Sequence, residues 1–405
     1  MTLPLDGLRV LDLSRILAGP SCTQTLGDLG ADVVKIERPG IGDDIRGWGP
    51  PFLKDRDGND TRESAYFMST NRNKRSLTVD IGSDDGLEII HDLIDKSDVL
   101  VENFKVGDLK RRGLDWGSVH ARNPRLVYCS ITGFGQTGPY AERPGYDFDV
   151  QGMGGLMSIT GEAAGQPMKV GVPISDIMSG MYAAVSILAA LRERDQTGVG
   201  RHIDISLLDC QAAWLYNQAS NYLVGGVHPG RLGNAHPNIV PYETFATADG
   251  HINLAVGNDG QYRRLCQAIG RPNLADDPRF VTNTLRLTNR DAALIEIRAE
   301  LAKKPSAQWL TDLQAAGIPC GPINTIPEVF DDPHIQARGI VQEINHSAAP
   351  NVKAKVMRTP IRMEGHEFGV RLPPPMLGEH TDEILSKMLN YDPKKITDLR
   401  EKGTI

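Results

Sequence analysis

Residues 8–37 have the sequence LRVLDLSRILAGPSCTQTLGDLGADVVKIE. The apolar run Leu8–Leu13 predicts a buried strand, Pro20–Gly30 a helix, and Val33–Glu37 the next strand. A strand, a helix and a strand within thirty residues form the unit from which parallel sheets are built.

The same alternation continues along the first third of the chain. Further strands are predicted at Ser76–Ile81, Asp98–Glu102 and Arg125–Ile131, and a helix at Asp84–Lys96 lies between the first two of these. We therefore expect an α/β fold with a parallel, doubly wound sheet of the Rossmann-like kind.

Ligands of such sheets bind beyond the carboxyl ends of the strands. The residues that follow the predicted strands there are Arg15, Arg38, Asn103 and Thr132–Phe134. An arginine after the second strand suits a phosphorylated ribose, although a surface ion pair is the commoner role of such a residue.

Composition sets broad limits on the function. A length of 405 residues favours two domains, and 40% apolar with 23% charged residues is typical of a soluble globular protein. A net charge of -7 without a long basic run argues against nucleic acid as a partner. The longest nearly apolar stretch, Met181–Leu191, is too short to span a bilayer, so no membrane partner is expected.

Cysteine and histidine usage points to a reducing compartment and to no metal. The five cysteines are scattered without a CxxC pair, and the ten histidines show no close metal-ligand spacing. The residues Met1–Val10 do not have the pattern of a signal peptide, so we expect a cytoplasmic protein.

The second half of the chain has a different organisation. A helical stretch, Ser206–Val224, leads into the Gly-, His- and Pro-rich segment Gly225–Pro241, which predicts a domain boundary. Residues Tyr242–Ile323 have the pattern of a smaller α+β domain, and a final helix is expected at Thr381–Leu389.

Asp176 is the main candidate for chemistry. It ends the Gly- and Pro-punctuated run Val170–Ser175 and precedes an apolar helix predicted at Ile177–Arg194. The positive end of the helix dipole favours the ionised carboxylate, and with a reference pKa of about 3.9 it would be charged at neutral pH and able to act as a nucleophile. A plain helix N-cap is the commoner role of an aspartate at this place.

Two other motifs have ordinary structural interpretations. Gly133–Gly138 matches GxGxxG but precedes Pro139 rather than a helix, which favours a tight structural loop over a dinucleotide site. Basic residues at Arg72, Lys74 and Arg75, and at Arg111–Arg112, suit either phosphate binding or solvated faces, and their spacing does not separate the two.

Several blocks of sequence carry a resemblance. These blocks are Pro4–Asp12, Ala18–Pro20, Lys35–Arg38, Asn73–Ser76, Val101–Phe104, Gly145–Asp147, Gly317–Pro322 and Leu377–Thr381. In this order along nearly the whole chain they resemble the family III CoA-transferases.

The resemblance implies a fold and an assembly. A large Rossmann-like, CoA-binding domain is expected at 1–205, completed by about 345–405, with a linker helix at 206–225. A small domain is expected at 226–330, with a return linker at 331–345, and two chains would form an interlocked homodimer.

The resemblance also implies a reaction and a site. CoA would move from an acyl-CoA to a free carboxylic acid through a thioester on Asp176, with CoA or acyl-CoA as substrate and no tightly bound cofactor or metal. The positions implied to contact CoA are Leu17, Ala18, Arg38, Asn103, Phe104, Arg111, Tyr146 and Asp147, with Val79–Gly82 as further candidates.

Details within the family favour a dicarboxylate acceptor such as glutarate, with succinyl-CoA as donor. Segments including Gly42–Asp44 and Trp48–Phe52 resemble members of that specificity. Racemases of this fold would have histidine at the position of Tyr146, and a phenol with a pKa of about 10 is a poor base. A racemase-type enzyme, and a non-catalytic CoA-binding protein, remain the alternatives.

A dicarboxylate's distal group requires a cationic or multiply donating partner. Candidates are Arg15, Arg46, Arg231 and His236, and the sequence does not choose among them.

Overall fold

A computed structural model describes residues 2–405, which form two compact units. The first unit contains the chain up to Leu156, Lys169–Ala219 and Gln336–Ile405. The second contains Met157–Met168 and Ser220–Ile335. The chain therefore leaves the first unit twice and returns to it with its C-terminal segment.

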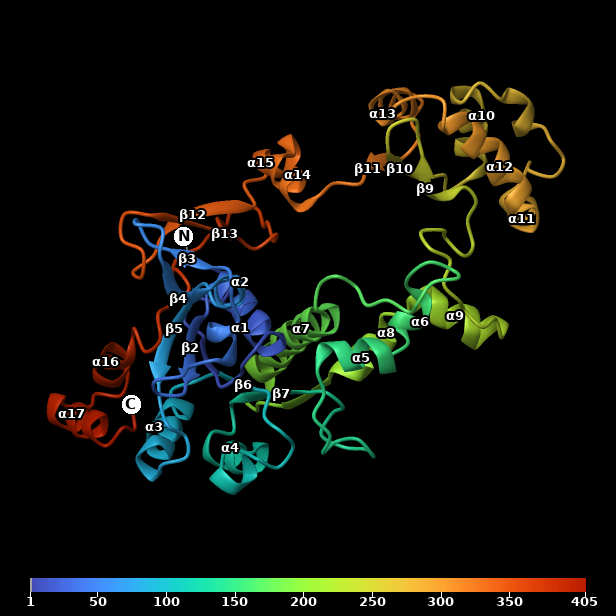
Figure 1. The fold of residues 1–405 in the computed structure, drawn as a ribbon. Coiled ribbons are helices and arrows are strands. Elements are labelled where there is room, and N and C mark those ends of the chain that lie inside the picture. Colours follow the sequence, from blue (N-terminus) through green and yellow to red (C-terminus); the bar gives the residue numbers. More distant parts are fainter. Residues whose placement is uncertain (1) are drawn as a thin grey trace. The chain divides into compact units, whose positions relative to one another are not determined.

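A six-stranded parallel sheet organises the described part of the first unit (Figure 1). Its order is β5-β2-β1-β6-β7-β8, and every neighbouring pair is parallel. The strands are β1 (Arg9–Asp12), β2 (Asp32–Glu37), β5 (Lys74–Thr78), β6 (Val99–Glu102), β7 (Val127–Thr132) and β8 (His202–Ser206). The α/β class with a parallel sheet is thereby confirmed, and β8 is a strand that the sequence did not predict.

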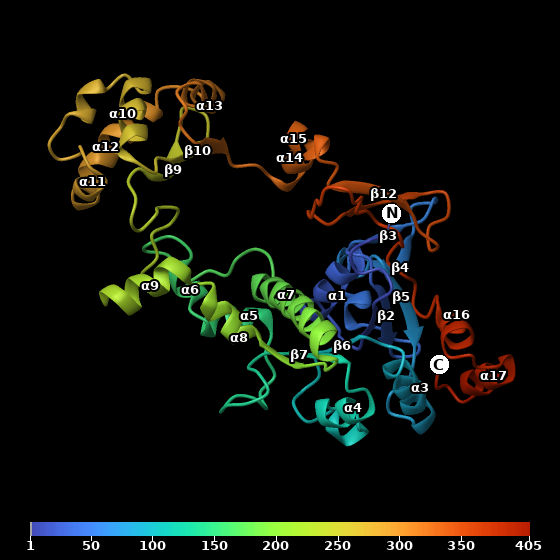
Figure 2. The same ribbon diagram turned by 180° about the vertical axis from the view of Figure 1, so that it is seen from behind.

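Helices cover both faces of this sheet because successive strand residues point to opposite sides. Val10 and Val33 pack with α1 (Ala18–Asp28) and α7 (Ile174–Thr197). On the other face, the cluster that contains Leu11 and Val34 includes residues of α3 (Asp84–Ile94), α4 (Trp116–Arg122) and α17 (Pro393–Glu401). The view from behind shows these three helices below and beside the strands (Figure 2).

The C-terminal segment of the chain packs against the edge strand β5 of the sheet in the first unit. His380 N–H donates to Ser76 O at 2.9 Å, and Asn73 N–H donates to Leu372 O at 2.9 Å, so the returning chain lies along β5. Its elements are β12 (Val341–Asn345), β13 (Lys353–Met357), α16 (Thr381–Glu383) and a π-helical turn at Ile384–Met388. The predicted return linker at 331–345 thus contains β12, which pairs antiparallel with β13.

Helix α7 is longer than the sequence predicted. It begins at Ile174, three residues earlier than expected, and runs for 24 residues. By length and composition it is apolar enough to cross a membrane, and half of its most apolar window is buried inside the protein. Its buried side, with Ala183 and Ile187, belongs to the same core cluster as α1.

The remaining elements of the first unit are short. They are η1 (Asp44–Gly47), β3 (Phe52–Lys54), β4 (Asp60–Ser64), α2 (Ala65–Thr70), η2 (Lys110–Arg112), α5 (Asp147–Met153) and α8 (Leu207–Ala213). The single helix expected at Ser206–Val224 is two helices, α8 and α9 (Tyr216–Gly225), because Tyr216 adopts a φ of 35° that ends a regular helix.

The second unit has an antiparallel sheet in the order β11-β10-β9. Its core contains Phe245, Ile252 and Trp309, contributed by strands and helices together. Its elements are β9 (Tyr242–Ala246), β10 (His251–Ala255), β11 (Cys320–Pro322), α10 (Asp259–Ala268), η3 (Pro272–Ala275), α11 (Asn283–Thr288), α12 (Arg290–Leu301), α13 (Ser306–Ala315) and α14 (Ile326–Asp331). Two short helices, α6 (Leu156–Ile159) and α15 (Pro333–Ala337), lie at the chain positions where the units change.

Candidate functional site

The strand order reverses between β1 and β6, and the loops that follow these two strands are joined by hydrogen bonds. Arg15 N–H donates to Asn103 Oδ1 at 2.9 Å, and Asn103 Nδ2 donates to Arg15 O at 2.7 Å. Ligands of open α/β sheets bind in the crevice at such a reversal. Both residues line a cavity of about 290 Å³ in the first unit.

The glycine-rich loop after β7 forms another part of this cavity wall. A Cβ on Gly133 would lie 2.6 Å from Gly145 Cα, so the two backbones approach more closely than any side chain would allow. No helix follows the loop until α5, and the predicted structural role of Gly133–Gly138 agrees with this geometry. The contact brings Gly145 and Tyr146 to the cavity.

Asp176 lines the same cavity from the first turn of α7. Gly180, one turn later, allows α7 to approach α1, because a Cβ there would lie 2.2 Å from Ser21 Oγ and 2.6 Å from Ala18 O. Because Gly180 has no side chain, α7 packs close to α1, and Asp176 and the first residues of α1 line the same cavity.

Asp147 supplies the cap that the sequence assigned to Asp176. Its Oδ1 accepts from Ser175 N–H at 2.8 Å and from Asp176 N–H at 3.4 Å. Asp176 is the third residue of α7, whereas an N-cap residue directly precedes the helix. The interpretation of Asp176 as the N-cap is therefore wrong. The carboxylate of Asp176 is left available to the cavity.

The ionisation expected for Asp176 is also wrong. Burial, and then the charge of Asp147, raise the pKa of Asp176 from 3.8 to about 7. Desolvation and a neighbouring carboxylate both disfavour the charged form, and together they outweigh the helix dipole. The carboxyl group is thus poised to titrate near neutral pH.

A second, smaller cavity of about 110 Å³ lies after β2. Arg38 lines this second cavity together with Val79, Asp80 and Ile81. Arg15 and Phe104 line both the first and the second cavity. Of the positions implied to contact CoA, the first cavity has Leu17, Ala18, Asn103, Phe104 and Tyr146, and the second has Arg38 and Phe104.

Comparison with known proteins decides the family. Residues 5–381 match the family described as CoA-transferase family III. The chain belongs to CoA-transferase family III. It is therefore an enzyme, and CoA thioesters are its substrates.

Individual relatives are similar over nearly their full lengths. A succinate--glutarate CoA-transferase from Agrobacterium fabrum is 48% identical over 95% of this chain and 96% of the relative. The human succinyl-CoA:glutarate CoA-transferase is 41% identical over 99% of this chain and 90% of the relative. A CAIB/BAIF family protein from Brucella suis has a crystal structure with a TM-score of 0.83 and 47% identity, covering 96% of this chain and all of that one.

Two positions implied to contact CoA do not line either cavity of the transferase. Asp147 makes the helix cap described above, and its other oxygen accepts from Gln151 Nε2 at 2.7 Å. Arg111 is largely exposed and forms an ion pair with Asp108, which does line the first cavity.

The candidates for the acceptor's distal carboxylate separate clearly. Arg15 lines the cavity that contains Asp176. Arg46 is buried and occupied, with ion pairs to Glu37 at 2.7 Å and Glu63 at 3.0 Å. The others, Arg231 and His236, belong to the second unit. Sequence reasoning missed two further cations of the cavity wall, Lys105 and Arg143, which no local pattern marks.

The basic cluster of Arg72, Lys74 and Arg75, in β5 and just before it, is structural. Arg72 pairs with Asp28 at 2.5 Å, Lys74 with Asp12 at 3.1 Å, and Arg75 with Asp32 at 2.7 Å. These cations are occupied by carboxylates of the same unit and do not form a phosphate site. Among residues 2–405, no group of three or more His, Cys, Asp or Glu side chains is placed to hold a metal ion.

Proposed function

We propose that this transferase moves CoA from succinyl-CoA to a free dicarboxylate such as glutarate, with Asp176 as the nucleophile. The observation that carries the proposal is a carboxyl group in the first turn of α7, on a cavity shared with Arg15 and the start of α1. The names of the similar relatives, which specify succinate and glutarate, support the choice of acids.

The proposed reaction needs neither a net proton nor an electron. A carboxylate oxygen of Asp176 attacks the thioester carbonyl of succinyl-CoA, the C–S bond breaks, and a mixed anhydride and CoA thiolate result. The thiolate then attacks the aspartyl carbonyl, which releases succinate and leaves an aspartyl-CoA thioester. Glutarate attacks this thioester to give a second anhydride and thiolate, and the thiolate attacks the glutaryl carbonyl to form glutaryl-CoA and free Asp176.

Backbone donors near Asp176 support this chemistry. Helix α1 begins at Ala18 without a side-chain cap, so the N–H groups of Ala18 and Gly19 are available to a developing oxyanion, whereas Pro20 has no N–H to offer. Leu17 and Ala18 both line the cavity. Such donors are most effective when they are fixed before the reaction.

Substitution of the nucleophile is the direct mechanistic test. Asp176→Ala is expected to abolish transfer while leaving the circular dichroism spectrum and the thermal midpoint of the fold in place. Turnover that persists in Asp176→Ala would reject the aspartyl mechanism.

The acid pair is tested by mass spectrometry. Purified enzyme is mixed with succinyl-CoA and glutarate, itaconate, mesaconate, citramalate, oxalate or carnitine in turn. Glutaryl-CoA with stoichiometric succinate is the expected result, whereas another acyl-CoA would reassign the acceptor. Deuterium uptake from solvent into a branched acyl-CoA, with no exchange among the acids, would favour a racemase with Tyr146 in the role of base.

We propose Arg15 as the partner of the acceptor's distal carboxylate. It lines the cavity with Asp176, and its guanidinium group lies 5.9 Å from the centre of the Phe104 ring. Arg15 also forms an ion pair with Asp44 at 2.9 Å, in which both side chains are about 40% exposed. A charge-assisted hydrogen bond is worth about 1.5–3 kcal/mol, so Arg15→Gln should lower kcat/KM for glutarate by roughly 10- to 100-fold. Pentanoate, which lacks the distal group, should be unaffected. If Arg143→Gln rather than Arg15→Gln removes the preference for glutarate over pentanoate, the assignment to Arg15 is refuted.

We propose further that the enzyme works as an interlocked homodimer in the cytoplasm, with 1–205 and 345–405 forming the CoA-binding domain and 226–330 the small domain. Exposed apolar side chains support a partner surface: on α7, Ile177, Met181 and Val185 recur at helical spacing and are 36, 48 and 60% exposed. All five cysteines are free, which suits a reducing compartment. Light scattering after size exclusion should give twice the chain mass of 44.2 kDa.

A further inference from the structure

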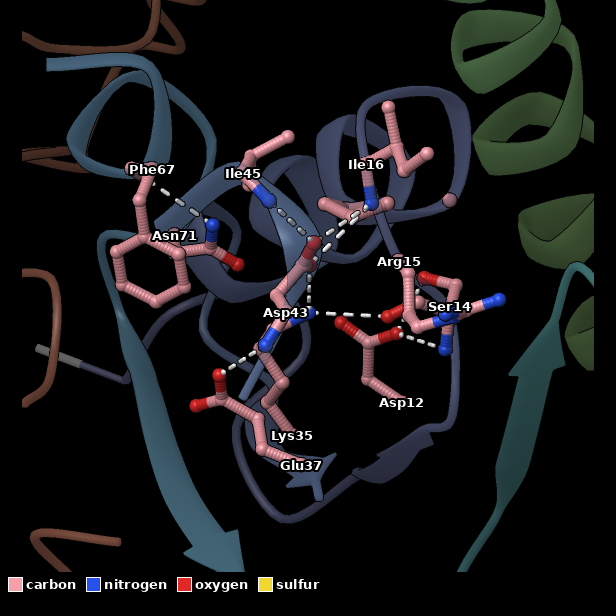
Figure 3. A network of polar contacts seen from close by, with 12 residues as sticks. Asp12, Ser14, Arg15, Ile16, Lys35, Glu37, Asp43, Ile45, Phe67 and Asn71 are labelled. Carbon is pink, nitrogen blue, oxygen red and sulfur yellow. Dashed lines mark hydrogen bonds and ion pairs between the residues drawn. The ribbon is translucent and has the colours of Figure 1, made fainter. Parts of the chain in front are cut away.

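Beneath the loop that follows β1, a lysine and an aspartate are buried together. Lys35 Nζ lies 2.8 Å from Asp43 Oδ2, and neither side chain is exposed. Figure 3 shows the pair at the centre of a network that includes Asp12, Ser14 and Ile16. A buried ion pair seldom makes a protein more stable than apolar residues of similar size would, so stability alone does not explain the Lys35–Asp43 pair.

This pair bonds to the backbone of the loop. Both oxygens of Asp43 accept from Ile16 N–H, at 3.1 and 3.2 Å. Lys35 Nζ also donates to Ser14 O at 2.9 Å. Together with the two hydrogen bonds between Arg15 and Asn103, these contacts occupy the backbone groups of three successive residues.

The loop requires such restraint because Ile16 has a φ of 71°. A β-branched side chain in the left-handed region is sterically unfavourable and persists only where its surroundings impose it. Ile16 lines the cavity of Asp176, and so do its neighbours Arg15, Leu17 and Ala18. The strained residue is therefore part of the wall that meets the substrate.

We propose that Asp43 is a positioning residue for CoA transfer. Its buried carboxylate, paired with Lys35, holds Ile16 in the left-handed conformation and so keeps Arg15, Leu17 and Ala18 in place on the cavity that they share with Asp176. An apolar pair would fill the same space but would offer no acceptor to Ile16 N–H. The catalytic part of this inference rests on the proposed function, and the structural part does not.

The first test compares Asp43→Asn with Asp28→Asn. In the parent protein, the Asp43 carboxylate accepts hydrogen bonds from Ile16 N–H, Ile45 N–H and Lys35. In Asp43→Asn, one carboxylate oxygen is replaced by an NH₂ group, which is itself a donor and faces these donors. Asp28 is the matched control, because it is a buried carboxylate that accepts hydrogen bonds from Arg72 and Asn73 rather than from the Ser14–Ala18 loop.

Two measurements distinguish the loss of loop positioning from general destabilisation of the protein. Both are made well below the thermal midpoint of unfolding of each variant. Hydrogen–deuterium exchange of the peptide that contains Ile16 should become at least about tenfold faster in Asp43→Asn and stay unchanged in Asp28→Asn. Transfer by Asp43→Asn should fall in kcat/KM on the order of 10²-fold, whereas Asp28→Asn should keep both kinetic constants of the parent enzyme.

A rescue experiment tests the strain directly. Asparagine tolerates the left-handed region better than other non-glycine residues, so Ile16→Asn added to Asp43→Asn should recover part of the lost activity. Ile16→Val keeps the β-branch and should recover none. If Asp43→Asn does not fold, Lys35→Met/Asp43→Leu replaces it, since removing both charges together avoids an unpaired buried ion.

Three results would overturn the proposal: parental exchange in Asp43→Asn, equal kinetic losses in Asp43→Asn and Asp28→Asn, or equal recovery by the two Ile16 substitutions. A parent enzyme that transfers CoA to no acid would instead reject the proposed function. The exchange measurement would then still decide whether Asp43 holds the loop.

Discussion

Asp147→Asn should shift the pH dependence of transfer to lower pH. Burial and the charge of Asp147 are the two causes that raise the pKa of Asp176 from 3.8 to about 7. The substitution removes the charge but keeps an oxygen able to accept from Ser175 N–H, a bond now 2.8 Å long, so the helix cap should persist.

The size of the shift follows from the order of the two causes. The change from 3.8 to about 7 spans about three pH units, and because burial is the larger cause, Asp147 accounts for less than half of it. We therefore expect the pKa of Asp176 to fall by roughly one pH unit in Asp147→Asn. Since only the carboxylate is nucleophilic, activity is lost as pH falls through the pKa, and at pH 6 the ionised fraction should rise from about 10% to about 50%.

The assay is kcat/KM for succinyl-CoA from about pH 5 to about pH 8.5, which reports ionisations of the free enzyme and free substrate. Asp149→Asn is the matched control: Asp149 lies in the same first turn of α5 but is not a cause of the shift at Asp176. The CoA phosphates titrate identically in every variant, so differences between variants belong to the enzyme. An acid limb that stays in place in Asp147→Asn, or that moves equally in Asp149→Asn, would refute the reasoning.

Two further predictions concern packing and buried charge. Gly180→Ala should lower the free energy of unfolding, measured by denaturant titration, by about 1–3 kcal/mol, because the new Cβ would lie 2.6 Å from Ala18 O. Gly171→Ala is the control and should be nearly neutral, because no atom lies within 4 Å of a Cβ at that position. Arg46→Met should cost about 3–5 kcal/mol, measured in the same way, because it leaves Glu37 and Glu63 buried without their shared cation; an unchanged unfolding midpoint would contradict this.

The sheet could be predicted because its signal is local. Short apolar runs separated by helical patterns place β1, β2, β6 and β7 within a few residues of their observed bounds. The hairpin of β12 and β13 and the edge strand β8 lack such a signal: β12 alternates exposed and half-buried residues, and only the last two residues of β8 are buried. Their strand conformation depends on pairing with neighbours.

The electrostatics of the site could not be predicted from spacing. The cations Arg72, Lys74 and Arg75 have their partners at Asp28, Asp12 and Asp32, more than 40 residues earlier in the chain. The pKa of Asp176 depends on burial and on Asp147, 29 residues away, whereas the local sequence displays only the helix dipole. Long-range packing therefore reverses a local expectation.

A raised pKa has opposite effects on the two roles that the proposed reaction gives to Asp176. A more basic carboxylate is a better nucleophile toward the thioester, but it is a poorer leaving group when the second anhydride returns CoA to the product acid. Succinate and glutarate carboxylates have ordinary basicity in water, so a strongly perturbed Asp176 would make its own release the slower of the two anhydride cleavages. The start of α1 has no side-chain cap and lines the same cavity through Leu17 and Ala18, so its backbone N–H groups can offer hydrogen bonds to an anion there. By stabilising the tetrahedral oxyanion through which Asp176 both attacks and leaves, such donors would lower the barrier of both steps without making the free carboxylate less basic.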